Sequence, residues 1–154
     1  RIPFPVITQD AQPFEIGKAN ILRRGKDVSI IACGLMVSEA LKAAQMLSRE
    51  KIEAEVINMH TLKPLDEETI FQSARSAGAI VTAEEHQMYG GLGSAVAEGL
   101  GKRHPVPLEM VAVRDTFGES GEPEELLIKH HLKDTDIVSA AKKALKRKRG
   151  VILA

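Results

Sequence analysis

The sequence predicts an α/β fold in which a mainly parallel five-stranded sheet lies between two layers of helices. Short β-branched runs alternate with amphipathic helical segments along most of the chain. Strands separated by helices of this length require crossover connections, which produce parallel pairs covered on both faces. The opening stretch PFEIGKANILRRG (13–25) has the pattern of an additional edge strand, which we expect to be antiparallel.

Four runs are predicted to form the parallel strands. The first, DVSIIACG, is a short β-branched run that ends in glycine and is typical of a fully buried strand. The others have a similar length and lie between helical segments. The predicted strands are 27–34, 54–60, 79–85 and 108–115.

The first two predicted helices show a core face and end signals. The segment 36–50 places its apolar residues on one helical face, namely Val37, Ala40, Leu41, Ala44 and Leu47. In the segment 66–78, Asp66 can serve as the N-cap, and Gly78 ends the helix. Both helices are long enough to connect parallel neighbours.

Three further helices complete the pattern. One follows a glycine-rich turn and extends to about Lys102. The segment 121–131 carries Pro123 in its first turn, a position that proline favours. The segment 134–149 closes the domain.

Composition and charge exclude several classes of protein. With 154 residues, of which 44% are hydrophobic and 27% charged, the chain has the size and balance of one globular domain. No apolar run approaches the ~20 residues that span a bilayer, and no signal peptide is visible. Cys33 has no second cysteine with which to form an internal disulfide. We therefore expect a cytoplasmic protein without membrane association.

The formal net charge is zero, but the segment KKALKRKR (142–149) is strongly basic. Basic residues complement the partial negative charge at a helix C-terminus. The other interpretation is nucleic-acid binding, for which one tyrosine, four phenylalanines and no tryptophan leave little base stacking. We therefore expect a solvated helix end and no nucleic-acid partner. Residues 150–154 form a tail that is either a frayed end or an arm laid on a partner.

The glycine-rich turn in TAEEHQMYGGLGSAVAEGL has two interpretations. Gly90, Gly91 and Gly93 lie between a strand and a helix, where dinucleotide-binding folds hold a pyrophosphate. Starting from Gly91, the second glycine fits, but Val96 stands at the third position, where a bulky side chain blocks close packing. The interpretation we favour is structural. Gly90 and Gly91 supply positive φ angles, and Gly93 allows the helix to approach the strand closely.

Two residues near the end of the last predicted strand are further candidates. Asp115 could bind a ribose in the nucleotide-binding interpretation, which stays open. Phe117 lies among small and acidic residues and would be costly to leave in water. We expect Phe117 to be covered by another surface.

Glu84, Glu85 and His86 sit at the carboxyl end of a predicted strand, the edge where open α/β sheets bind ligands. Because the two glutamates are adjacent in a strand, they point to opposite faces and cannot flank one substrate. We expect one to buttress the glycine turn and the other to meet solvent or a neighbour. His86 is a candidate proton carrier, but no serine or cysteine motif supplies a nucleophile for it. Direct catalysis by this cluster is the weaker interpretation.

The sequence does not predict a metal site. His60, His104, His130 and His131 have no histidine partner at i+4, and Cys33 stands alone. We expect Cys33 to be a small core residue. The residues alone indicate a well-formed scaffold without a complete reaction centre.

Four segments, in order, resemble the C-terminal domain of transketolases. They are PFEIGKANILRRGKDVSIIACGLMVSEALKAA, VINMHTLKPLDEETI, VTAEEHQMYGGLGSAVAEGL and VRDTFGESGEPEELL, and they cover about residues 13–149. The same domain type occurs in 1-deoxyxylulose-5-phosphate synthase and in the β subunits of 2-oxoacid dehydrogenases, which remain alternatives. The segment DTFGESGEPEELL favours transketolase, particularly the short C-terminal section of split bacterial or archaeal forms.

The resemblance implies that the chemistry lies on other domains. In this family thiamine diphosphate and Mg²⁺ (or Ca²⁺) bind between two earlier domains through a G-D-G motif, and a glutamate of the middle domain activates the coenzyme. This sequence contains no G-D-G, and neither Glu84 nor Glu85 corresponds to that glutamate. The complete enzyme would transfer a two-carbon ketol unit between sugar phosphates of the pentose phosphate pathway.

The resemblance also implies a role for this domain. It would support a homodimer and the assembly with the N-terminal domains, and the chain alone would be inactive. The residues expected at an interface or at the edge of the site are Glu84, Glu85, His86, Gly90, Gly91, Gly93, Asp115 and Phe117.

One residue is expected to bind substrate. RIPFPVI resembles the junction after the middle domain, where transketolases place an arginine that binds the sugar phosphate, and Arg1 corresponds to it. A guanidinium group suits a phosphate because it offers bidentate hydrogen bonds. The alternative is an ordinary linker arginine. Whichever role Arg1 has, the resemblance implies three segments. Residues 1–12 would be a linker from a missing pyrimidine-binding domain, 13–149 the C-terminal-like domain and 150–154 the tail.

Overall fold

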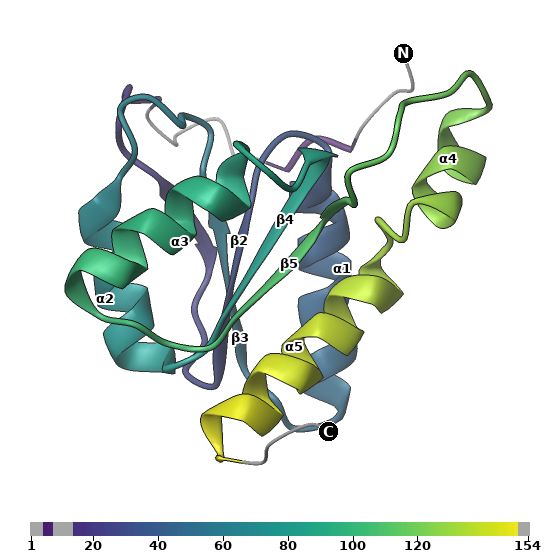
Figure 1. The fold of residues 1–154 in the computed structure, drawn as a ribbon. Coiled ribbons are helices and arrows are strands. Elements are labelled where there is room, and N and C mark those ends of the chain that lie inside the picture. The colour runs from purple at the N-terminus through teal and green to yellow at the C-terminus, as the bar shows by residue number, and fades with distance from the viewer. Residues whose placement is uncertain (1–4, 8–13, 151–154) are drawn as a thin grey trace.

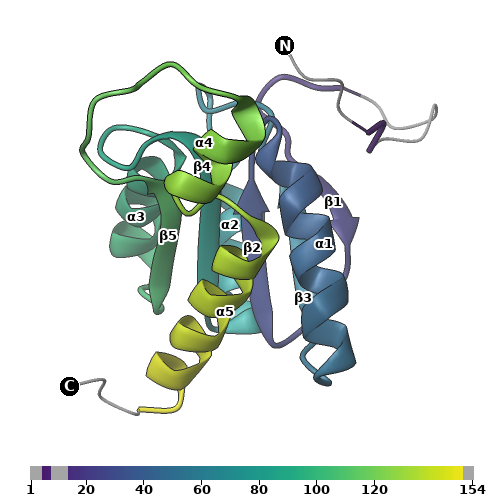
Figure 2. The ribbon, with the colours of Figure 1, turned by 90° about the vertical axis from the view of Figure 1, so that its right-hand side faces the viewer.

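The computed structural model describes residues 5–7 and 14–150 and shows three layers (Figure 1). Two helices cover each face of a central sheet (Figures 1 and 2). The helices on one face are α1 (Met36–Arg49) and α5 (Asp134–Lys148), and those on the other are α2 (Glu67–Ala77) and α3 (Leu92–Arg103). A short helix, α4 (Pro123–Lys129), stands apart beyond the carboxyl ends of the strands (Figure 1). The predicted αβα fold class is confirmed.

The described residues form a five-stranded sheet with the order β1-β3-β2-β4-β5. The strands are β1 (Asn20–Arg23), β2 (Val28–Ala32), β3 (Ala54–Asn58), β4 (Ile80–Gln87) and β5 (Leu108–Val113). The pair β1–β3 is antiparallel, and the other pairs are parallel, as predicted. The edge strand is shorter than the predicted 13–25, because Gly17, with φ of 82°, lies in a turn before it.

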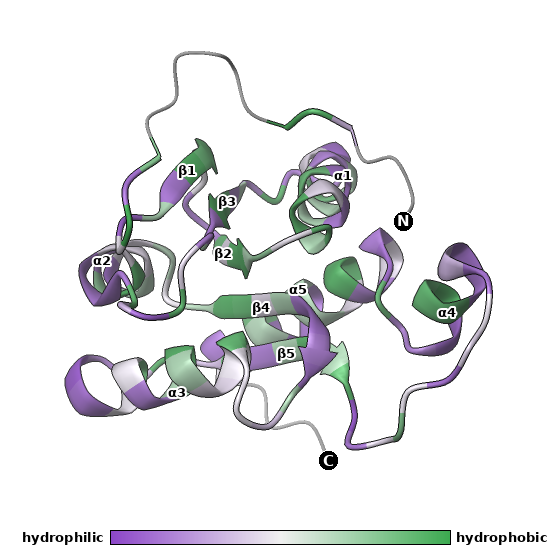
Figure 3. Cartoon of the chain, turned by 90° about the horizontal axis from the view of Figure 1, so that it is seen from above, coloured by the Kyte–Doolittle hydropathy of each residue, from purple (hydrophilic) through white to green (hydrophobic). Residues whose placement is uncertain are grey.

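The centre of the sheet is buried on both faces. All five residues of β2 are buried, which explains why its sequence does not alternate between apolar and polar. Ile30 belongs to the core under α1 and α5, and the adjacent Ile31 to the core under α2 and α3. Seen from above, the apolar parts of β2 and β4 lie between the helix layers (Figure 3). On α1 the predicted face is buried except for Leu41, which is only partly buried.

The predicted ends of α2 are confirmed. The carboxylate of Asp66 accepts a hydrogen bond from the backbone N–H of Thr69 at 3.1 Å, and Gly78 ends the helix in the left-handed conformation. Asp66 also accepts from the backbone N–H of Ala19 at 2.9 Å. This second bond ties the helix to the start of the edge strand, and the sequence did not predict it.

The basic end of α5 makes more contacts than a solvated helix end would. Lys148 donates from Nζ to the carbonyl oxygen of Ala77 at 2.7 Å. Arg147 and Lys143 both pair with the carboxylate of Glu109 on β5, at 2.7 and 2.8 Å. Arg147 and Lys143 therefore connect α5 to the edge strand β5, and Lys148 connects it to the end of α2. None of the described helices is both long and apolar enough to cross a membrane.

Candidate functional site

The topology of the sheet selects one place for a site. Strands β2 and β4 are neighbours, yet β2 connects through α1 to β3 on one side, and β4 connects through α3 to β5 on the other. Open α/β sheets bind ligands in the crevice outside the carboxyl ends of two strands related in this way. Here those ends are formed by Cys33 and Gly34 after β2, and by Glu84 and Glu85 in β4. The regular pairing of β4 with β5 shifts between Ala83 and Gln87.

Glu84 is a structural cap. Its side chain is only 2% exposed, and its carboxylate accepts hydrogen bonds from the backbone N–H groups of Leu92 and Gly93 at 2.7 and 2.8 Å. These groups belong to the first turn of α3, where a helix has no acceptors of its own and carries partial positive charge. The prediction that one of the paired glutamates buttresses the glycine turn is confirmed.

The glycines have three different tasks. Gly90 has φ of 78°, as predicted, and a side chain there would meet open space. The prediction of a positive φ for Gly91 is wrong, because its φ is −94°. Gly91 is needed for space instead: an added Cβ would overlap the carboxylate of Glu84 and lie 2.8 Å from the carbonyl oxygen of Gln87. An added Cβ at Gly93 would lie 2.8 Å from Sδ of Met110, which confirms the predicted close approach of helix and strand.

This arrangement opposes the nucleotide-binding interpretation. A phosphate at a helix N-terminus needs free backbone N–H groups and the positive end of the helix dipole. The carboxylate of Glu84 already accepts from two of those groups. Asp115, the candidate ribose-binding residue, is exposed and has φ of 50°. The glycine turn therefore positions a carboxylate of the chain itself.

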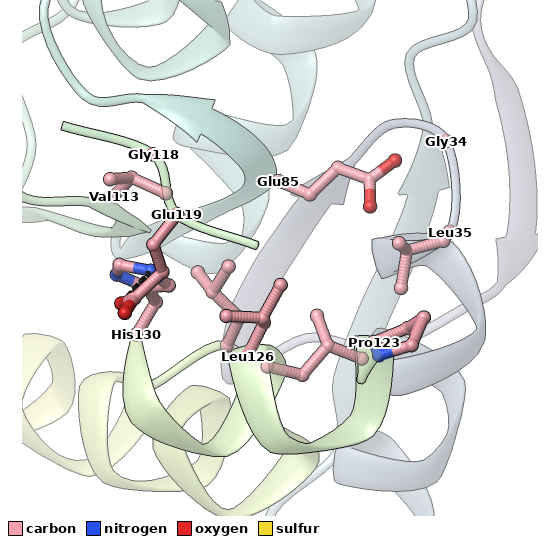
Figure 4. A pocket seen from close by; sticks show the side chains of 11 residues that line it. Gly34, Leu35, Glu85, Val113, Gly118, Glu119, Pro123, Leu126 and His130 are labelled. Atoms are coloured by element: carbon pink, nitrogen blue, oxygen red, sulfur yellow. Dashed lines mark ion pairs between the residues drawn. The ribbon is translucent and has the colours of Figure 1, made fainter. Parts of the chain in front are cut away.

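Glu85 points the other way, into a groove between α4 and the ends of β2, β4 and β5 (Figure 4). The groove has a volume of about 760 Å³. Most of its lining side chains are apolar, and the lining residues are Gly34, Leu35, Glu85, Val113, Gly118, Glu119, Pro123, Leu126, Leu127, His130 and Leu132. Glu85 stays accessible to solvent, but its partial burial raises the pKa of its carboxyl above the usual value.

The two acidic residues of the groove differ in their partners. Glu119 pairs with Lys129 at 2.8 Å and lies 3.6 Å from Nε2 of His130. Figure 4 shows Glu119 and His130 at one end of the groove and the Glu85 carboxylate at the other, beside Gly34. Within residues 5–7 and 14–150, Glu85 has no ion pair with a lysine, arginine or histidine.

Two further candidates, His86 and Phe117, do not line the groove. His86 is exposed, and the side chain of Phe117 is fully exposed. The loop that carries Phe117 is tied to β4, because Nε2 of Gln87 donates to the carbonyl oxygen of Thr116 at 2.6 Å. The structure thus brings Glu85 to the groove, while Phe117 lies on the rim next to the lining residue Gly118 and His86 is exposed outside the lining. Arg1 lies outside the described residues.

Cys33 packs against the core under α2 and α3, in line with the expectation of a small core residue. Burial, with smaller effects of Glu84 and Glu85, raises the pKa of its thiol to about 11. The thiol is therefore protonated at neutral pH and is a poor nucleophile.

The residues present do not fit thiamine diphosphate and its metal ion. No group of three or more histidine, cysteine, aspartate or glutamate side chains converges as a metal site in the part of the chain that the structure describes. The first turn of α3, the natural place for a diphosphate at this edge of the sheet, is capped by Glu84.

The groove was not predicted from the sequence. Its base and walls come from segments that are distant in the sequence, namely the start of α1, the end of β5 and the region around α4. The adjacent leucines Leu126 and Leu127 could have indicated the groove. A helix as short as α4 cannot bury both of them against the same layer of the fold, so one is left facing solvent or a partner. Leu127 is buried, and Leu126 is only partly buried beside the groove.

Fold and site together define an α/β domain whose anion-binding helix end is closed and whose strand ends carry an apolar groove. The family described as "Transketolase, C-terminal domain" matches residues 17–137. The chain belongs to this family.

Two curated relatives and one solved structure illustrate the match. The 6-deoxy-6-sulfo-D-fructose transketolase subunit of Clostridium sp. (strain MSTE9) is 50% identical over 96% of this chain and 46% of its own length. A putative transketolase C-terminal section of Methanocaldococcus jannaschii is 40% identical over 90% of this chain and 43% of its own length. A structure described as a split gene transketolase, inactive β4 tetramer, superposes with a TM-score of 0.91 at 49% identity, covering 95% of this chain and 48% of that one.

Other relatives are named as a different enzyme, 1-deoxy-D-xylulose-5-phosphate synthase. The 1-deoxy-D-xylulose-5-phosphate synthase of Desulforudis audaxviator is 41% identical over 93% of this chain and 23% of its own length. The chain spans about half the length of the transketolase relatives that it matches.

Proposed function

We propose that this chain is the C-terminal part of a transketolase that transfers a two-carbon ketol unit between sugar phosphates. Thiamine diphosphate and a divalent metal ion would bind to the domains that precede this one, whether these are fused to this chain or form separate subunits. All of these preceding domains together are called the N-terminal section. This domain would hold the assembly together and shape the edge of the site, and the complete protein would be a dimer of such assemblies. Arg1 is proposed to bind the phosphate of the sugar.

The proposal is supported mainly by the residues at the carboxyl edge of the sheet. The place where such a sheet binds a phosphate is closed by Glu84, while an apolar groove and the fully exposed Phe117 lie next to it. An exposed apolar patch of this kind is typical of an interaction surface. The domain therefore has the features of a docking unit, and the family supplies the enzyme to which it would belong.

The similar solved structure supports the dependence on a second section. It is described as an inactive β4 tetramer of a split gene transketolase. The chain that it contains covers this chain almost completely and extends beyond it. A chain of this type without its complementary section would accordingly have no activity.

The test is an assay of two-carbon transfer with the chain alone and with its N-terminal section. Xylulose 5-phosphate and ribose 5-phosphate are supplied with thiamine diphosphate and Mg²⁺, and sedoheptulose 7-phosphate is measured. We expect product only when both parts are present. Product from the chain alone would refute the proposal. Formation of 1-deoxyxylulose 5-phosphate from pyruvate and glyceraldehyde 3-phosphate would assign the complete protein to the synthase instead.

A further inference from the structure

The groove is open because α4 stands away from the sheet. Its base is formed by Leu127 and Leu132, which are 7% and 3% exposed. Leu126 and Pro123 form the more open wall on α4, opposite the Glu85 side (Figure 4). Contiguous apolar surface that faces water is unfavourable and marks a surface that a partner covers.

The charge in the groove limits what the partner can be. Glu119 is already paired with Lys129, whereas Glu85 has no cationic partner within residues 5–7 and 14–150. A carboxylate on an apolar wall is stabilised by a cation that arrives with apolar surface around it. Arginine and lysine both supply such a cation on a long apolar stem.

The same charges disfavour a sugar phosphate in this groove. No lysine or arginine lines it in the described part of the chain, and both of its charged carboxyl residues, Glu85 and Glu119, would repel a phosphate. The apolar wall offers few hydrogen-bond donors for sugar hydroxyls. The lining therefore suits a protein segment.

We propose that the groove between α4 and the ends of β2 and β4 receives an apolar segment of the N-terminal section, and that a lysine or arginine of this segment pairs with Glu85. This inference rests on the proposed function, since it names the contact by which the two sections recognise each other. The partner is defined by its chemistry: apolar side chains that face Leu126 and Leu35, and one cation that faces the carboxylate.

The first experiment measures the dissociation constant of the complex between this chain and its N-terminal section by analytical ultracentrifugation of the diluted complex. Glu85→Gln removes the charge at nearly constant shape, and Glu85→Lys reverses it. Glu98→Gln is the matched control, because Glu98 is exposed on α3, away from the groove. We expect Glu85→Gln to raise the dissociation constant at least about tenfold, Glu85→Lys to raise it further, and the control to stay within about twofold.

The second experiment identifies the cation. A carbodiimide joins a carboxylate directly to a lysine amine, so the wild-type complex is treated and the linked peptides are sequenced. A link from Glu85 to a lysine of the N-terminal section supports the proposal. If the cation is an arginine, no link forms, and the support comes instead from a charge swap: changing that arginine to glutamate restores binding to Glu85→Lys.

The outcomes separate this inference from the proposed function. Equal dissociation constants for Glu85→Gln and Glu98→Gln, in a complex that is active, would overturn the inference and leave the proposed function standing. A link from Glu85 to a second copy of this chain would also overturn it. If the wild-type chain and the N-terminal section do not assemble at all, the proposed function fails as well. Thermal unfolding of each variant shows that a change in affinity is not a loss of fold.

Discussion

At the scale of single residues, two adjacent glutamates of β4 have opposite tasks. Alternation along a strand sends Glu84 into the protein and Glu85 out to the groove. Glu84 is stabilised by two backbone N–H groups of α3, so its carboxylate replaces the acceptors that the first helical turn lacks. The same glycine turn that resembles a phosphate cradle therefore serves a side chain of the protein itself.

Gly91 tests this interpretation at a single position. Gly91→Ala places a methyl group against the carboxylate of Glu84 and 2.8 Å from the carbonyl oxygen of Gln87, so we expect the free energy of unfolding to fall by about 3 kcal/mol. Gly99→Ala is the control, since its methyl group meets no atom within 4 Å and the helix gains propensity, worth about 0.5–1 kcal/mol. Urea unfolding followed by circular dichroism measures both. Equal stabilities of the two variants would show that Glu84 does not need the space above Gly91.

At the scale of elements, Asp66 joins α2 to the edge strand β1. Its carboxylate accepts from the backbone N–H of Ala19 at 2.9 Å and from both the N–H and the hydroxyl of Thr69, at 3.1 and 2.8 Å. One side chain thus satisfies the start of the helix and fixes the chain that leads into β1. The antiparallel strand, which has no crossover helix of its own, is held partly by this contact.

The pH dependence of stability tests the role of Asp66. Burial alone raises the pKa of its carboxyl, but the hydrogen bonds from Ala19 and Thr69 outweigh burial and lower the pKa below 3.8. A carboxyl with a lowered pKa in the folded state stabilises the protein above its unfolded pKa. That contribution to the free energy of unfolding is lost as the pH falls through the pKa that the carboxyl has in the folded state.

We therefore expect the free energy of unfolding of the wild-type chain to decline below about pH 4 and to decline less steeply in Asp66→Asn, which has no carboxyl to protonate. Urea unfolding at a series of pH values from about 7 to 3 measures the two slopes. Glu67→Gln, at an exposed position of the same turn, is the control and should keep the wild-type slope. Parallel curves for the wild type and Asp66→Asn would contradict the assignment.

At the scale of the whole molecule, the surfaces of the domain are unequal. The two helix layers bury the sheet on both faces, whereas the carboxyl edge carries α4 (Figure 1) and the groove (Figure 4). Phe117 and Tyr89, in the segments that follow β5 and β4, are exposed. If a partner covered this edge, the most exposed apolar side chains that the structure describes around β4 and β5 would be shielded from water. This is the physical reason to place the contact with the N-terminal section here.

Phe117 separates a role in assembly from a role in folding. Because its side chain is fully exposed, Phe117→Ser should change the free energy of unfolding of this chain by less than about 0.5 kcal/mol. If the rim contacts the N-terminal section, the same variant should weaken the complex about tenfold or more, since buried aromatic residues dominate interfaces. Ile16→Ser, which changes an exposed apolar residue near β1, is the control. The contradicting result is an unchanged dissociation constant for Phe117→Ser, measured by ultracentrifugation.

Much of the fold and part of the site followed from local patterns. The elements were predicted because their signals are contiguous: β-branched runs for the strands, the Asp66 and Gly78 caps for α2, and the alternation that separates Glu84 from Glu85. The φ of Gly91 was predicted wrongly. A position can require glycine because its φ is positive or because there is no space for a Cβ, and the sequence does not distinguish these two reasons.

The sequence by itself determined the α/β class, the order of the elements and the family, because each depends on residues that are neighbours along the chain or on motifs read in order. Only the tertiary structure decided which of the two adjacent glutamates caps α3, which strand Asp66 holds, and that Glu85 faces an apolar groove. The last two features join residues 47 to 98 positions apart, from Ala19 with Asp66 to Gly34 with Leu132. Contacts over such separations arise only when the sheet brings its strand ends to one edge.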